Sequence, residues 1–79
     1  MNLVNEIMHQ YREVARTGTI PSVLVVSLEI WDKLRADKEA SLQLRLAYKQ
    51  SDPSQPDMFR DLVISVLPSY HMTNYIKVA

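Results

Sequence analysis

The hydrophobic pattern at the start of the chain has the period of an α-helix. Apolar side chains recur every three or four residues between positions 2 and 16, with charged and amide side chains on the opposite side. The apolar stripe consists of Leu3, Ile7, Tyr11 and Val14. Asn2 can cap the first turn, and Gly18 stands where helices commonly end. The pattern therefore predicts an amphipathic helix over residues 2–16 that covers a sheet.

A continuous run of mostly β-branched and aliphatic residues follows at positions 22–27. Such runs are typical of strands buried on both faces, and Pro21 fits at the start of one because no ladder hydrogen bond is needed there. Ser27 is then placed to cap a second helix, with Trp31 and Leu34 on its apolar face. We expect Trp31 to anchor this helix in the core, because it offers the largest apolar area in the chain.

The stretch over residues 37–50 allows two interpretations. Leucine and tyrosine alternate with other residues from position 42 to position 48, which favours a half-exposed strand. The residue types favour a helix instead, since Leu, Gln, Arg, Ala and Lys have high helix propensity and Asp37 could cap the first turn. We favour the strand, because a helix would place the alternating apolar residues on different sides.

Two more β-prone segments complete the predicted sheet. A polar loop with two prolines at positions 51–57 is followed by a hydrophobic run at 62–67, and a second alternating run closes the sequence at 75–78. The few residues between these last two runs suit a hairpin loop. The order of elements is helix, strand, helix, possible strand, strand, strand. It predicts one two-layer α+β domain over residues 1–79, with two or three helices on a small mixed sheet of three to four strands.

The composition limits what so small a domain can do alone. The 79 residues include no cysteine, which excludes a disulfide framework and a thiolate metal site. A chain of this size buries only roughly 60% of the surface that its unfolded form exposes, so small folds often gain stability from a partner. Nine basic and nine acidic side chains cancel, which argues against binding that depends on neutralising phosphates. The sequence has no apolar run of membrane-spanning length, and its N-terminus lacks the pattern of a secretory signal.

Residues that commonly carry chemistry are scattered along the sequence. His9 and Glu13 are one helical turn apart, but such a single pair more often forms a surface ion pair than a metal site. Ser27 lies between a strand and a helix, as hydrolase nucleophiles do, yet the flanking glycines of that turn are absent and capping explains it better. One glycine is too few for a nucleotide-binding loop. We therefore expect no enzyme activity, no cofactor and no metal.

Aromatic and basic residues in the C-terminal half are candidates for contacts with a partner. A nucleic-acid strand could bind at Arg45, Tyr48 and Lys49, or at Tyr70, His71 and Tyr75. The sparse spacing of these residues and the balanced charge argue against it. Tyrosine and methionine are enriched at protein interfaces, and exposed strand edges invite pairing. The candidate partner-binding residues are Tyr70, His71, Met72, Tyr75, Ile76 and Val78. An equally weighted alternative is that these residues only close the core.

Three segments carry a further pattern: residues 20–22 leading into 25–27 with Trp31 and Leu34, residues 58–66, and the closing run at 75–78. Together they resemble small proteins encoded by tailed bacteriophages. The resemblance implies a phage source and a size class, and it assigns no functional residue.

The function that we expect is non-enzymatic protein–protein contact. The chain would be a virion component or a self-assembling homo-oligomer, located in the cytoplasm of a host cell or in the virion. An inhibitor that binds a bacterial protein is one alternative, and a small DNA-binding regulator is another.

Overall fold

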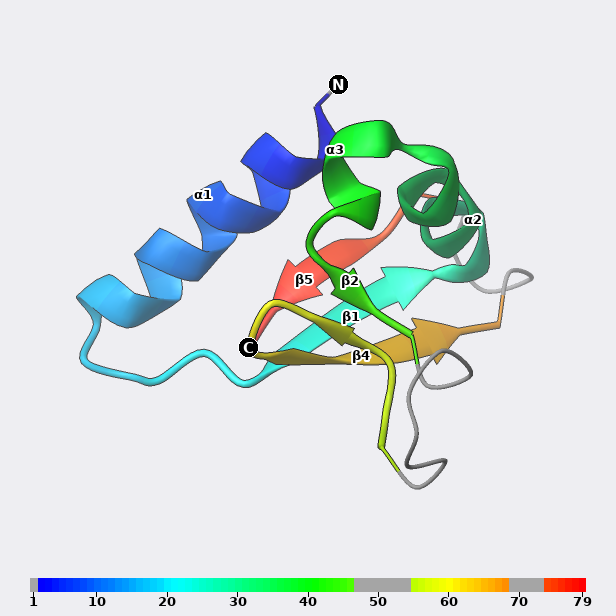
Figure 1. Ribbon diagram of the computed structural model, residues 1–79. Coiled ribbons are helices and arrows are strands. Elements are labelled where there is room, and N and C mark those ends of the chain that lie inside the picture. The colour runs from blue at the N-terminus through cyan, green and yellow to red at the C-terminus, as the bar shows by residue number, and fades with distance from the viewer. Residues whose placement is uncertain (1, 47–54, 69–73) are drawn as a thin grey trace.

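Three helices lie on one face of a five-stranded sheet in the computed structural model, which describes residues 2–46, 55–68 and 74–79 (Figure 1). In chain order the elements are α1 (Leu3–Arg16), β1 (Val23–Ser27), α2 (Leu28–Ala36), α3 (Lys38–Ser41), β2 (Leu44–Arg45), β3 (Met58–Phe59), β4 (Leu62–Leu67) and β5 (Ile76–Val78). The predicted two-layer α+β class is confirmed, and the sheet has five strands instead of three to four.

Each helix begins at a residue whose side chain accepts a hydrogen bond from the backbone N–H three positions later. The donor–acceptor distances are 3.1 Å at Asn2, 3.3 Å at Ser27 and 3.0 Å at Asp37. Gly18 follows the end of α1 with a φ of 88°, a left-handed conformation that side chains disfavour. The predicted caps at Asn2, Ser27 and Gly18 are confirmed, and Asp37 caps the short helix α3.

The strand order is β2-β3-β4-β1-β5, with β1 parallel to β4 and antiparallel to β5. Val26 of β1 pairs with Val66 on one side and with Ile76 on the other. The predicted hairpin between the last two strands is therefore wrong, because β1 lies between them. The physical reason is that β1 is a continuously apolar strand, and a central position in the sheet buries such a strand best.

The stretch over residues 37–50, for which the sequence allowed a strand or a helix, contains one of each in its described part. Its first residues form α3, and Leu44 then pairs with Phe59 of β3 in the antiparallel pair β2–β3. The predicted strand is confirmed only for β2. Leu42, which the alternation assigned to the strand, lies in the turn after α3 and is 85% exposed. The residues at 47–50 lie outside the described part of the chain.

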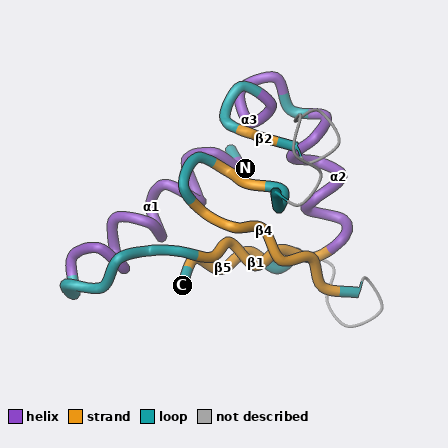
Figure 2. The backbone as a smooth tube through the Cα atoms, turned by 60° about the horizontal axis from the view of Figure 1, so that its bottom comes forward, coloured by secondary structure: helices purple, strands orange, loops and turns teal. Residues whose placement is uncertain are grey.

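The core fills the space between the helices and one face of the sheet, and Figure 2 shows α1 and α2 on the same side of β1 and β5. The largest fully buried side chains are Phe59, Ile7, Leu24, Ile30, Leu34, Leu62 and Val26. Trp31 is only 9% exposed, so its predicted role as a core anchor is confirmed. The prediction that β1 is buried on both faces is wrong. Leu24 and Val26 are fully buried, whereas Val23 and Val25 face away from the helices and are half-buried.

Candidate interaction surface

The sheet face that points away from the helices is built from alternate residues of the strands. Side chains alternate between the two faces along a strand, and directly paired residues share a face. Because Leu24 and Phe59 point into the core, their neighbours Val25 and Met58 point outward. We call two adjoining rows of this surface the helix-free face. They consist of Arg45, Met58, Val63, Ser65, Val23, Val25 and Lys77. Leu67, which continues β4, lies beyond these rows.

Two cross-strand rows run over the helix-free face. The first row contains Arg45, Met58, Val63 and Val23. The second row contains Ser65, Val25 and Lys77. Apolar side chains therefore form the centre of the face, while Arg45 on β2 and Lys77 on β5 stand at opposite edges of the sheet.

The apolar centre is separate from the core. Val63 is 38% exposed, and the other three apolar residues of the face are half-buried. None of the four belongs to the buried cluster or to the hydrophobic residues that pack against it. At the rim, the Arg45 Nη2 atom lies 3.6 Å from Met58 Sδ and donates a hydrogen bond of 3.0 Å to the carbonyl oxygen of Arg60. These contacts hold the guanidinium group beside the apolar centre.

The edge of the sheet at β5 is occupied by a side chain of α1. Gln10 donates from Nε2 to the carbonyl oxygen of Ile76 at 3.0 Å, and its Oε1 accepts from the N–H of Val78 at 2.9 Å. The carbonyl and the N–H flank Lys77, and they are the backbone groups that a further strand would use. The Gln10 amide therefore stands where that strand would bind, and it protects the edge from strand addition.

The structure describes half of the predicted partner-binding residues. Tyr70, His71 and Met72 lie outside the described residues. Tyr75 and Ile76 are half-buried, and Val78 is 3% exposed. Ile76 packs against the core and Val78 is part of it, so for these two residues the structure favours the alternative that they close the core. The prediction omitted Lys77, the exposed side chain of β5.

His9 and Glu13 lie on an exposed part of α1. Glu13 forms an ion pair with Arg16, and this hydrogen bond lowers the pKa of the Glu13 carboxyl, with a smaller contribution from the charge of His9. Across residues 2–46, 55–68 and 74–79, no group of three or more His, Cys, Asp or Glu side chains could hold a metal ion. The pair thus belongs to a network of surface charges.

Two conspicuous hydroxyl groups connect elements of the fold. Ser27 Oγ is fully buried and accepts from the backbone N–H of Tyr75 at 3.4 Å, in addition to capping α2. The Tyr11 hydroxyl donates to Asp61 Oδ2 at 2.9 Å, and this hydrogen bond raises the pKa of Tyr11. The first contact joins α2 to the residue before β5, and the second joins α1 to the turn before β4. Each of the two hydroxyl groups therefore has a structural role in the fold.

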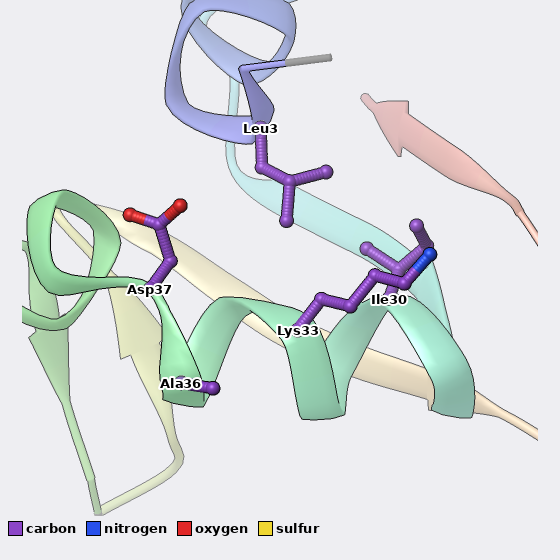
Figure 3. Close-up of a pocket in the computed structure, with 5 residues that line it drawn as sticks. All are labelled: Leu3, Ile30, Lys33, Ala36 and Asp37. Carbon is purple, nitrogen blue, oxygen red and sulfur yellow. The ribbon is translucent and has the colours of Figure 1, made fainter.

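A groove of about 380 Å³ lies between the start of α1 and α2. Figure 3 shows Leu3 projecting from α1 toward the α2 side, where Ile30, Lys33 and Ala36 line the groove and Asp37 ends it. Lys33 Nζ lies 3.4 Å from Glu29 Oε1, and the Asp37 carboxylate caps α3. The charged groups at this groove therefore already have partners within the fold.

Comparisons with protein-family models, with curated proteins and with solved structures give no match. Among the described residues, no helix is long and apolar enough to cross a membrane. The function is therefore inferred from the chemistry of the surface itself.

Proposed function

We propose that this protein acts by binding another protein through the helix-free face of its sheet. The observation that carries the proposal is the set of apolar side chains on that face, at Val23, Val25, Met58 and Val63. Contiguous exposed apolar patches mark protein interaction sites, whereas exposed apolar side chains that are scattered singly need no such explanation. The proposal therefore assigns the centre of the contact to these four residues.

The residue pattern of the central strand supports the same conclusion. β1, which pairs with β4, is apolar at every position up to Ser27, and such a run is typical of a strand that is covered on both faces. In the described residues, the helices cover one face of this pair and leave Val25 and Val63 on the other. A partner protein would supply the second cover.

Contact without catalysis is the activity that this surface supports. The buried hydroxyl of Ser27 and the amide of Gln10 are engaged in hydrogen bonds that hold the fold together. The resemblance to tailed-phage proteins supports two settings for such a contact, one within a virion and one on a host protein. A DNA-binding regulator fits less well, because Arg45 and Lys77 lie at opposite edges of the face and do not form a basic cluster.

The test compares two substitutions that place the same charge at different exposed apolar positions. Val63→Asp changes the centre of the helix-free face, and Leu42→Asp changes the exposed turn after α3 as a matched control. Tagged forms of the chain are expressed in bacterial cells, the setting that the resemblance to phage proteins implies. Captured proteins are purified and titrated against each variant by calorimetry. A protein that binds the unchanged chain and Leu42→Asp, but not Val63→Asp, would support the proposal.

Val63→Thr separates loss of the surface from loss of the fold. Threonine keeps the β-branched shape that suits a strand, and it removes part of the apolar surface. Circular dichroism and urea unfolding of all three variants establish that each is folded. If the purified partner binds both Val63 variants as tightly as the unchanged chain, then the helix-free face is not the contact surface and the proposal is wrong.

A further inference from the structure

The charges of the helix-free face indicate what kind of surface it binds. Building on the function proposed above, we propose that the occupant is a different protein, whose contact surface has an apolar centre flanked by carboxylates, and not a second copy of this chain. The juxtaposition that carries this inference is an apolar centre between Arg45 and Lys77, on a face whose residues include no Asp or Glu.

Both cations of the face are available to a partner. Among the described residues, the ion pairs lie on α1 and α2, and neither Arg45 nor Lys77 takes part in them. Both side chains are exposed. The printed contacts of Arg45 involve Nη2, and a guanidinium group has further N–H donors with the spacing of a carboxylate. Carboxylates at the two edges would therefore complement this face.

Symmetry argues against a second copy on this face. Most homodimers are two-fold symmetric, so that the same patch is used on both subunits. With the two-fold axis along the strands, the β2 edge of one copy lies over the β5 edge of the other, and Arg45 faces Lys77. With the axis across the strands, each strand lies over its own copy, and Lys77 faces Lys77. Either arrangement places like charges opposite each other, which disfavours association.

A charge-reversed copy of the chain is the probe that tests this inference. Arg45→Glu combined with Lys77→Glu keeps the apolar centre and converts both edges of the face to carboxylates. The matched control is Arg12→Glu combined with Lys38→Glu, which reverses two exposed cations on α1 and α3, away from the face. Sedimentation equilibrium is measured for each chain alone and for each variant mixed one-to-one with the unchanged chain.

We expect each chain alone to remain monomeric and the first mixture to form a heterodimer. Two opposed charge pairs correspond to about a tenfold tighter dissociation constant than that of the unchanged chain with itself. The control mixture should stay monomeric. The heterodimer should weaken at high salt and disappear when either chain also carries Val63→Asp.

Three results would overturn the inference. If the unchanged chain dimerises alone and Val63→Asp abolishes the dimer, the occupant is a second copy, and the proposed contact surface still stands. If neither mixture associates, charge does not select the partner. The proposed function is then tested separately, by the capture experiment with Val63→Asp. If a labelled single-stranded DNA binds through Arg45 and Lys77 and still binds Val63→Asp, the cations serve nucleic acid.

Discussion

Gln10 is the residue whose replacement tests the architecture most directly. Its amide makes one hydrogen bond with the carbonyl of Ile76 and one with the N–H of Val78, at 3.0 and 2.9 Å. Gln10→Leu keeps a side chain of similar size and removes both of these hydrogen bonds, together with the one that Gln10 Nε2 donates to Glu6 Oε1 at 3.1 Å. The backbone groups at the edge of β5 then lose their partners in a partly buried place.

The size of the effect follows from these two contacts. A neutral hydrogen bond contributes about 1 kcal/mol, and a buried group left without a partner costs more, so Gln10→Leu should destabilise the fold by about 2–3 kcal/mol. For a domain of this size, that loss corresponds to a fall of roughly 8–24 °C in Tm. Arg12→Leu is the control, because Arg12 is an exposed residue of the same helix.

The assay combines urea unfolding with hydrogen exchange at single amides. In Gln10→Leu, the Val78 N–H should exchange much faster than in the unchanged chain, and the amides of β1 should change less. The open edge should also permit strand addition, so that self-association grows with protein concentration. If the Val78 N–H exchanges equally in both proteins, Gln10 does not close this edge and the reasoning fails.

Three other substitutions test a helix cap, a core side chain and a surface hydrogen bond. Ser27→Ala should cost about 1–2 kcal/mol in urea unfolding, because it removes the cap of α2; an unchanged urea midpoint would contradict this role. Phe59→Ala should cost about 3–5 kcal/mol, because Phe59 is fully buried, whereas a loss below about 1 kcal/mol would place Phe59 outside the core. The pKa of Tyr11 is raised by its hydrogen bond to Asp61, so the folded chain holds this proton more tightly than the unfolded chain. The stability from this bond is therefore present below about pH 10 and is lost as the pH rises through the raised pKa. The difference in urea midpoint between the unchanged chain and Tyr11→Phe should shrink from about pH 8 to about pH 11, and a constant difference would contradict this origin.

Local patterns predicted most of the elements, because their signals lie within a few residues. α1 follows from its apolar stripe and its cap at Asn2, and β1 and β4 follow from runs of β-branched residues. The order of the strands depends on contacts between distant segments, so the position of β1 between β4 and β5 could not be predicted in this way. β3 contains only Met58 and Phe59, which is too short for alternation to be visible.

The helix-free face could not be predicted from the sequence either, because it too depends on contacts between distant segments. Val23 and Val25 belong to a continuous apolar run, and such a run predicts burial on both faces of a sheet. That they face away from the core follows only from the placement of the helices on the other side. The role of Gln10 could not be predicted either, because an amide on the polar side of a helix is expected to face water. Its contact with β5 depends on how α1 lies against the sheet.

The pairing of the central strand also affects the order in which the chain can fold. Leu24 pairs with Ile64 on one side and with Val78 on the other, so both neighbours of β1 are synthesised long after β1 itself. While the ribosome makes the second half of the chain, the apolar residues of β1 lack both of their pairing partners, and exposed apolar segments are prone to aggregate. Substitutions that delay the docking of β4 or β5 should therefore lower the soluble yield in cells, even where they hardly change the stability of the finished fold.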